Sequence, residues 1–230
     1  MYALALSGGK DSMACLHLMR GQLACAIYVE TGYSYPETRA MVDYANTLLP
    51  VHIVTSDRDA QQAQAGWPSD VVPIAWTHLG QQVTTKKPMM IQSYLGCCFE
   101  NIAAPLLAKA RELGVTHLVY GQRREESHTS TARNGDAVMG LIRVHPIEDW
   151  TASQVLAYLD ERMGVPEHYR TVTHSSLDCY DCTGFQRDSQ DRIEWTRHHY
   201  PAFYAAYRSR ADQIDAAIQD SLSTTTRQGV

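Results

Sequence analysis

A glycine turn between a strand and a helix, at the start of the chain, most constrains the fold. Residues 2–6 form an apolar run typical of a buried strand, and residues 13–20 carry apolar side chains at helical spacing. This order points backbone N–H groups and the positive end of a helix at one spot, which favours a bound phosphate. Glycines let the backbone approach an anion closely, while lysine and serine side chains add donors. The residues of the turn are Ser7, Gly8, Gly9, Lys10, Asp11 and Ser12.

The turn Ser7–Ser12 resembles the PP-loop of the ATP pyrophosphatases, whose pattern is S-G-G-x-D-S. Its spacing is neither that of a Walker loop nor G-x-G-x-x-G. In the PP-loop superfamily the loop holds the pyrophosphate end of ATP while the α-phosphate is attacked, which yields an adenylated intermediate and pyrophosphate. The resemblance therefore implies that these six residues bind ATP. The alternative is an ordinary glycine-rich turn.

The composition is that of an ordinary globular protein. The 230 residues are 44% apolar and 20% charged, enough for one α/β domain with a full core. No run approaches the ~18–20 apolar residues of a membrane span, and no basic segment precedes the first strand, so we expect a cytoplasmic protein without membrane contact. The net charge of −5 argues against a broadly basic nucleic-acid surface, although not against a local basic groove.

The first third of the chain alternates strands and helices. Residues 23–29 and 51–55 read as strands, and Pro36 is well placed in the first turn of the helix between them. This alternation predicts a parallel sheet with right-handed crossovers, whose ligands bind at the carboxyl ends of the strands. The turn Ser7–Ser12 and the segment Glu30–Thr38 both fall at that edge.

The middle of the chain is less regular. We expect a short helix over residues 59–65 and then a long irregular connection to residue 96, because prolines and glycines interrupt every pattern. Lys86 and Lys87 lie in this connection, either solvated or binding an anion. A helical stretch opens at Cys97-Cys98, with Pro105 in a first turn.

An apolar strand over residues 115–120 leads into Gly121–Ser127 at the same sheet edge. Arg123 and Arg124 in this segment could clamp phosphate or sulfate, or they could be solvated, since two glutamates follow at once. A further strand covers residues 141–147. Thr151 and Gln154 then form a capping box that opens a helix to Met163, with Gly164 as its stop.

The C-terminal part is helical. Residues 193–199 and 202–222 read as helices with a row of aromatic side chains, for which core packing is favoured over stacking on a nucleobase. We therefore predict an α/β fold with a doubly wound, mostly parallel sheet, Rossmann-like and of the adenine-nucleotide α-hydrolase-like kind. Residues 1–185 would form the nucleotide-binding domain, and residues 186–230 a helical C-terminal extension.

The six cysteines suggest metal or redox chemistry. Cys179 and Cys182 place two thiols on one turn, as an iron–sulfur site, a zinc site or a redox disulfide needs. The adjacent pair Cys97-Cys98 is a weak zinc signal and requires an unusual local backbone to ligate one cluster. Cys15 and Cys25 lie in an expected helix and strand, and we predict that they are small buried hydrophobes.

Several segments together resemble the phosphoadenylyl-sulfate (PAPS) reductase family. A Cys-Cys pair, about 80 residues and then C-x-x-C is similar to the [4Fe–4S] signature of the bacterial adenylyl-sulfate reductases. Residues 30–38 resemble the family's D-T-G-x-x-F-P-E-T segment, residues 121–127 its G-x-R-R-x-Q-S segment, and residues 143–150 its K-V-N-P-L-x-D-W segment. The matches run from residue 4 to about 185. They imply a [4Fe–4S] cluster on Cys97, Cys98, Cys179 and Cys182, and a nucleotide contacted by Glu30, Thr31, Gly32 and Gly121.

Two departures from the family pattern stand out. Those reductases carry a catalytic cysteine in a C-terminal E-C-G-type motif, whereas no cysteine follows Cys182 in this sequence. Their phosphate loop is usually degenerate, whereas Ser7–Ser12 keeps the full pattern. Both departures favour an ATP-using relative, similar to the cluster-bearing tRNA thiolation enzymes or the sulfur-insertion protein of DNA phosphorothioation.

The predicted function is therefore an ATP pyrophosphatase that adenylates an acceptor and supports sulfur transfer beside the cluster. Lys10, Asp11, Arg123 and Arg124 would be catalytic, with Asp11 orienting Mg²⁺. The acceptor is left open between tRNA, DNA and a small molecule, and a sulfur donor or thiol reductant protein and a homo-oligomeric state are left open as well. Two alternatives are kept, a sulfonucleotide reductase that uses an external thiol and a non-catalytic nucleotide- and redox-sensing module.

Overall fold

The computed structural model describes residues 1–126, 132–172, 176–177 and 179–227. The chain divides into two compact units, each built from segments that are separated in the sequence. Unit 1 holds residues 1–30, 34–55 and 104–171, and unit 2 holds residues 31–33, 56–103 and the chain from 172 onward. The predicted boundary at residue 185 follows the extent of the sequence resemblance rather than compactness, and it stays a prediction.

Unit 1 is built on a mostly parallel sheet. Its strands are β1 (Tyr2–Ala5), β2 (Leu23–Glu30), β3 (Val51–Thr55), β6 (His117–Val119), β7 (Ala137–Val138) and β8 (Leu141–Val144). Among the described residues they lie in the order β3-β2-β1-β6-β8-β7, and only the β7–β8 pair is antiparallel. The chain therefore starts at a central strand, extends the sheet on one side and returns to extend it on the other. This confirms the predicted doubly wound fold.

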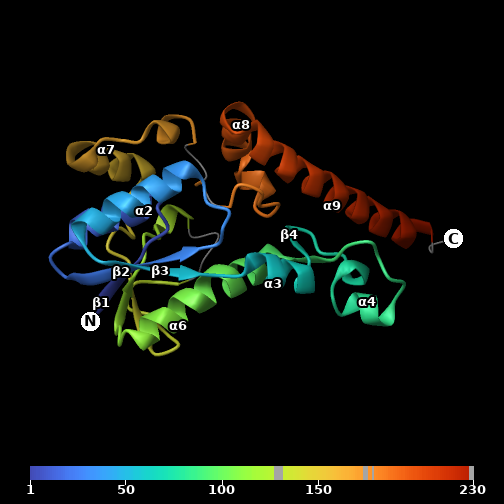
Figure 1. Ribbon diagram of the computed structural model, residues 1–230, viewed down its shortest axis with the longest axis horizontal. Coiled ribbons are helices and arrows are strands. Elements are labelled where there is room, and N and C mark those ends of the chain that lie inside the picture. The colour runs from blue at the N-terminus through green and yellow to red at the C-terminus, as the bar shows by residue number, and fades with distance from the viewer. Residues whose placement is uncertain (127–131, 173–175, 178, 228–230) are drawn as a thin grey trace. The chain divides into compact units, whose positions relative to one another are not determined.

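Helices cover both faces of this sheet (Figure 1). The helices of unit 1 are α1 (Lys10–Met19), α2 (Pro36–Leu48), α6 (Ala104–Glu112), α7 (Ala152–Met163) and the short turns η3 (Arg124–Glu126) and η4 (Glu167–Arg170). Alternate residues of β1 separate the two faces, because Leu4 packs with the α1, α2 and α7 side and Ala3 with α6. The apolar runs of the central strands are thus buried on both sides, as parallel sheets require.

Local signals in unit 1 are mostly confirmed. Pro36 stands at the start of α2, and Thr151 and Gln154 form the capping box of α7, which ends at Gly164 with a φ of 74°. The strand predicted over residues 141–147 ends earlier, at Val144, near Pro146, which has no N–H for a ladder bond. The β7–β8 hairpin was not predicted. It turns at Met139 and Gly140, which both have a positive φ. Methionine rarely adopts this conformation, so its presence does not indicate a turn.

Unit 2 contains the connection that the sequence predicts to be irregular. Its elements are α3 (Arg58–Ala65), β4 (Trp67–Ser69), η1 (Ile74–Trp76), α4 (Gly80–Val83), β5 (Ile91–Ser93), α5 (Tyr94–Cys98), the π-helical η2 (Phe99–Ala103), η5 (Gln186–Asp188), α8 (Gln190–His199) and α9 (Pro201–Arg227). Strands β4 and β5 form a parallel pair. Helix α5 begins before Cys97, and the π-helical η2 follows Cys98 directly, so the backbone departs from a regular α-helix after the adjacent cysteines.

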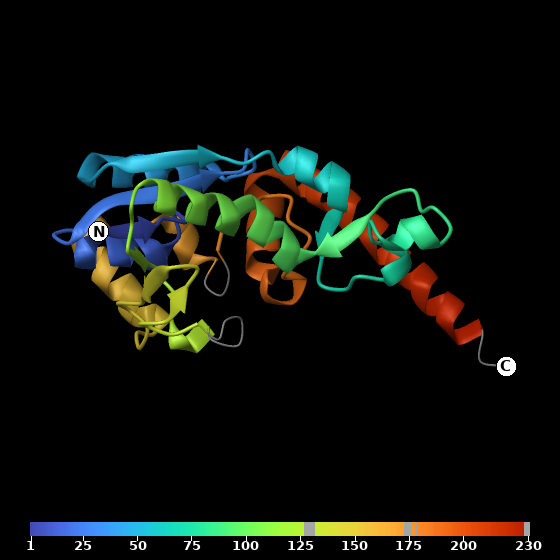
Figure 2. The same cartoon turned by 90° about the horizontal axis from the view of Figure 1, so that it is seen from below.

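The long C-terminal helix α9 belongs to the core of unit 2 and runs beside the segment that carries β4 and α4 (Figures 1 and 2). Its residues Ile214 and Ala217 pack with Trp76 and Ile91. Lys87 forms an ion pair with Asp220 of the same helix, at 3.0 Å, so its charge has a structural partner. No described helix is both long and apolar enough to cross a membrane.

Candidate functional site

The predicted phosphate loop connects β1 to α1. Gly8 has a φ of 77°, and a Cβ at this position would lie 2.8 Å from Cγ2 of Thr38, so only glycine fits. Gly9 is the N-cap of α1, and in the described structure no side chain caps this helix. Uncapped N–H groups in the first turn of a helix are suited to an anion, and phosphate binding here stays a prediction.

The serine hydroxyls of the loop bond to one another and to the loop backbone. Ser12 Oγ donates to the Gly9 carbonyl at 2.9 Å, Ser7 Oγ donates to Ser12 Oγ at 3.1 Å, and the Gly9 N–H donates to Ser7 Oγ at 3.2 Å. Both hydroxyls thus hold the loop in shape. Ser12 is buried as well, which makes a structural role the observed one for these two residues.

A carboxylate lies between two cations beside the loop. Asp11 accepts from Lys10 Nζ at 3.0 Å and from Arg123 Nε at 2.7 Å, and both basic side chains are buried. Arg123 also donates to Glu125, whose carboxylate accepts the N–H of Ala152 at 3.0 Å. Each oxygen of Asp11 keeps a second lone pair, so the carboxylate fits a Mg²⁺ ligand role without losing these contacts.

Gly121 brings the segment after β6 against the first turn of α1. A Cβ on Gly121 would lie 2.6 Å from the carbonyl carbon of Asp11 and 2.7 Å from the nitrogen of Ser12. Its role in the described structure is therefore close backbone approach. Arg124 differs from Arg123, because its side chain is 55% exposed and pairs with Asp149 at 2.9 Å. Ser127, the last residue of this motif, lies outside the described residues.

The predicted nucleotide segment Glu30–Gly32 is divided between the two units. Glu30 belongs to unit 1, where it pairs with Arg39 at 3.2 Å and accepts from Ser34. Thr31 and Gly32 belong to unit 2. There the hydroxyl of Thr31 lies 3.5 Å from Sγ of Cys179. Thr31 thus belongs with the cysteines of its unit, which the sequence motif does not indicate.

The four cysteines predicted to hold a metal all belong to unit 2, and none is in a disulfide. Cys97 is buried and accepts N–H groups from Gln62 at 3.5 Å and from Asn101 at 3.6 Å. Four thiols outside any disulfide are the donor set that an iron–sulfur cluster takes. Within the described residues, however, no three His, Cys, Asp or Glu side chains gather into a metal-binding group. The four thiols are therefore of the kind that a cluster binds, and they lie in one unit. Within the described residues they do not gather around a single metal position.

The remaining cysteines are buried in the sheet and its covering helix. Cys15 and Cys25 are both in the core, and burial raises the pKa of each thiol. A thiol that resists deprotonation is a poor nucleophile and a poor metal ligand. This confirms the prediction that they are small hydrophobes.

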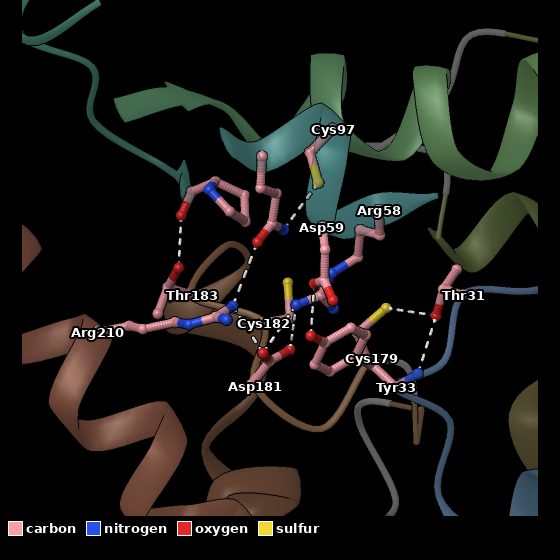
Figure 3. Close-up of polar contacts among 12 residues, drawn as sticks. Thr31, Tyr33, Arg58, Asp59, Cys97, Cys179, Asp181, Cys182, Thr183 and Arg210 are labelled. Atoms are coloured by element: carbon pink, nitrogen blue, oxygen red, sulfur yellow. Dashed lines mark hydrogen bonds and ion pairs between the residues drawn. The ribbon is translucent and has the colours of Figure 1, made fainter. Parts of the chain in front are cut away.

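Two groups of polar residues were missed by sequence reasoning. In unit 1, Lys10 Nζ lies 5.9 Å from the ring centroid of Tyr169. The neighbouring residue His168 has a lowered pKa, because burial outweighs the opposing effect of Glu37. In unit 2, Arg58 and Asp181 form a buried ion pair (Figure 3). Burial would lower the pKa of Arg58, but Asp181 and Cys179 outweigh it, so this pKa is raised. No local pattern links residues so far apart in sequence.

Known proteins with similar sequences are named as adenosine or phosphoadenosine phosphosulfate reductases. A family model described as "Phosphoadenosine phosphosulfate reductase domain" matches residues 1–185. An adenosine 5'-phosphosulfate reductase from Rhodococcus erythropolis is 24% identical over 160 residues, which covers 68% of this chain and 58% of the relative. A phosphoadenosine 5'-phosphosulfate reductase from Alkalilimnicola ehrlichii is 27% identical over 168 residues, which covers 72% of this chain and 62% of the relative. The chain thus spans about three-fifths of the length of these curated relatives.

A solved structure supports the fold. The phosphoadenylyl-sulfate (PAPS) reductase from Candida auris, crystallised as a phosphate complex, superposes with a TM-score of 0.52. The match covers 77% of this chain and 80% of the other, at 17% sequence identity. At this identity the likeness concerns the fold alone.

Proposed function

Since this chain belongs to the phosphoadenosine phosphosulfate reductase domain family, we propose that it is an enzyme that binds an adenine nucleotide at Ser7–Ser12, and that this nucleotide is ATP. The observation that carries the proposal is the loop itself. Gly8 and Gly9 leave the start of α1 open to phosphate, and Lys10 and Arg123 place two buried cations around Asp11 beside it. Outer phosphates and their metal ion are the ligands that use such a set of charges.

The proposed reaction is adenylyl transfer. A nucleophile of the acceptor attacks the α-phosphorus of ATP, the bond to the α,β-bridging oxygen breaks, and pyrophosphate leaves. Lys10 and Arg123 would stabilise the charge that grows on the phosphate oxygens, and Asp11 would orient Mg²⁺. Arg124, which is half-exposed, would contribute only long-range attraction of the anion.

We also propose that Cys97, Cys98, Cys179 and Cys182 hold a [4Fe–4S] cluster. Support comes from the absence of disulfides at these four cysteines, from their place in one unit and from the N–H groups that point at Cys97. Such a group, when bound, supplies a redox centre or an electron-deficient iron for sulfur chemistry. In the full reaction a thiolate or persulfide of a sulfur donor would displace AMP from the adenylated acceptor, which could be tRNA, DNA or a small molecule.

A second candidate function is favoured by the relatives, which are named as sulfonucleotide reductases. In that reaction two electrons from a dithiol protein cleave the sulfur–oxygen bond of the sulfonucleotide. Sulfite and the nucleoside monophosphate leave, and the dithiol becomes a disulfide. For this function the loop would need to bind only a monophosphate-level nucleotide, without the outer phosphates of ATP.

Calorimetric titration separates the two functions. We expect Mg·ATP to bind more tightly than adenylyl sulfate, and Lys10→Ala to weaken ATP more than AMP, because AMP lacks the outer phosphates. Lys109→Ala is the matched control, since Lys109 lies in the same unit in an exposed pair with Glu112. Tight binding of adenylyl sulfate with sulfite release, and no binding of ATP, would replace the first function by the second.

The cluster needs its own measurement. Anaerobically purified protein should be brown and contain about four irons per chain, with broad absorption near ~400 nm. Cys179→Ser should lose the iron and Cys15→Ser should keep it, because Cys15 is sealed in the core. Stoichiometric zinc without iron would reject the cluster.

A further inference from the structure

The residue between Tyr180 and Cys182 is a buried acid with two basic partners. Asp181 is 2% exposed. One nitrogen of Arg58 lies 2.6 and 2.7 Å from its two carboxylate oxygens, and Nη1 of Arg210 lies 2.6 Å from Oδ2. Figure 3 shows the carboxylate facing the ends of both arginine side chains. Buried carboxylates persist where this kind of pairing compensates their lost hydration.

The partners of Asp181 come from distant parts of unit 2. Arg58 is in α3 and Arg210 is in α9, so a single carboxylate ties the Cys179–Cys182 turn to two helices. Arg58 is itself held, because its guanidinium lies 3.6 Å from the ring centroid of Tyr33. Rigid support of this kind fixes the direction in which neighbouring side chains point.

The same network reaches the adjacent-cysteine segment. Arg210 donates to Oε1 of Gln62 at 3.3 Å, and Nε2 of Gln62 donates to Sγ of Cys97 at 3.5 Å. A third arginine, Arg192, donates to the carbonyl of Cys179 at 3.2 Å and to that of Cys182 at 3.5 Å. The C-x-x-C turn and Cys97 are therefore joined through one chain of hydrogen bonds, of which those made by the arginines are charge-assisted.

Arginine side chains surround the Cys179–Cys182 turn. Three guanidinium groups contact this turn, and within the described residues Asp181 is the carboxylate that pairs with Arg58 and Arg210. Asp59 lies beside the same group, where it accepts the hydroxyl of Tyr33 (Figure 3). Guanidinium groups near thiols stabilise thiolates and the negative charge of a thiolate-bound cluster.

We propose that Asp181 is the positioning residue of the cysteine site, with Arg58 and Arg210 as its clamps and Arg192 as support for the turn carbonyls. The proposal rests on the proposed role of the four cysteines as cluster ligands. It assigns α9 to that site through Arg210, although the sequence marks this helix only as an extension.

The first test measures iron in the full chain after anaerobic reconstitution. Asp181→Asn and Arg210→Gln should each lower iron affinity about tenfold or more, the range for residues that orient metal ligands. Arg210→Lys keeps the charge and should recover part of the loss. Arg208→Gln is the matched control, since Arg208 is on the same helix in an exposed pair with Asp212. Unchanged iron affinity in both Asp181→Asn and Arg210→Gln overturns the proposal.

A spectroscopic readout separates positioning from general stability. Arg210→Gln should make the midpoint potential of the remaining cluster more negative, because a positive charge beside it is lost. The triple variant Arg58→Met/Asp181→Leu/Arg210→Met removes all three charges and keeps the fold measurable, since apolar residues can replace a buried network of ion pairs. It should melt near the wild-type temperature and still hold iron weakly. Wild-type iron affinity in this variant also overturns the proposal.

Hydrogen exchange distinguishes failure of the clamp from failure of the cluster. In the metal-free full chain, amides of residues 179–182 should exchange about tenfold faster in Asp181→Asn and Arg210→Gln than in Arg208→Gln, because the turn opens more often. If the wild-type chain takes up no iron, the cluster is rejected, and faster exchange still supports Asp181 as the anchor of the turn. Equal exchange in all three variants rejects the anchor.

Discussion

Arg123 and Arg124 are adjacent in the sequence and have different surroundings. Arg123 is buried against Asp11, whereas Arg124 is exposed and pairs with Asp149. Arg123→Ala should therefore weaken nucleotide binding by about 1.5–3 kcal/mol, the range for hydrogen bonds to charged groups. Arg124→Ala should weaken binding much less, because exposed ion pairs contribute little. Calorimetry of both variants checks this, and equal losses would contradict it.

Gly121 provides a steric prediction at the same scale. A methyl group there would meet the backbone of Asp11 and Ser12. Gly121→Ala should destabilise the protein by about 1–3 kcal/mol, as overpacking does, and weaken nucleotide binding by displacing the loop. Gly21→Ala is the control, because nothing lies within 4 Å of its Cβ, and it should stay within about 0.5 kcal/mol. Urea unfolding measures the free energy of unfolding of both variants. An unchanged value for Gly121→Ala would show that the backbone of Asp11 and Ser12 can move to accommodate the methyl group.

His145 makes stability depend on pH. It is buried, neither ring nitrogen has a hydrogen-bond partner in the described structure, and burial lowers its pKa. The unfolded chain therefore takes up the proton at a higher pH than the folded chain. The free energy of unfolding is therefore at its full value above the unfolded pKa of about 6.5, and it decreases as the pH falls below that value.

His145→Phe should remove this dependence. Between about pH 7.5 and pH 5.5 the variant should lose less unfolding free energy than the wild type, because the ring no longer binds a proton. His78→Phe is the control, since His78 is exposed and should keep the wild-type slope. Parallel slopes for His145→Phe and wild type would assign the acid sensitivity to other groups. Urea unfolding at a series of pH values is the measurement.

At the scale of elements, the start of α7 shows what one cap contributes. The Thr151 hydroxyl accepts the Gln154 N–H at 3.2 Å, and the Gln154 side chain accepts the Thr151 N–H at 2.8 Å. Thr151→Ala should cost about 0.5–2 kcal/mol of unfolding free energy, and Thr151→Ser should restore most of it. Chemical denaturation of the three proteins decides; an unchanged midpoint in Thr151→Ala would mean that water replaces the cap.

At the scale of the whole molecule, nucleotide binding should be visible as stability. A ligand that binds only the folded state adds about 2.7 kcal/mol at 100 times its Kd. Mg·ATP should therefore raise the melting temperature of the wild type and raise that of Lys10→Ala less at the same concentration. GTP at equal concentration is the control for base recognition. A shift that is identical in wild type and Lys10→Ala would place the nucleotide away from the loop.

The sequence alone determined the fold class, the family and the position of the glycine turn between β1 and α1. These depend on local physics. Apolar periodicity identifies helices and strands, Gly8 and Gly9 mark the turn, Thr151 marks a helix start, and the alternation of elements predicts a parallel sheet with its ligand edge. The cluster, Mg²⁺, ATP and the acceptor stay predictions.

Only the tertiary structure decided which charges meet. It paired Asp11 with Arg123 rather than with Arg124. It assigned the adjacent residues Glu30 and Thr31 to different compact units. It also placed Asp181 between Arg58 and Arg210. The physical reason is that an ion pair needs only proximity in space. A sequence with 20 basic and 25 acidic residues offers many equivalent pairings, and burial by the packed elements selects among them.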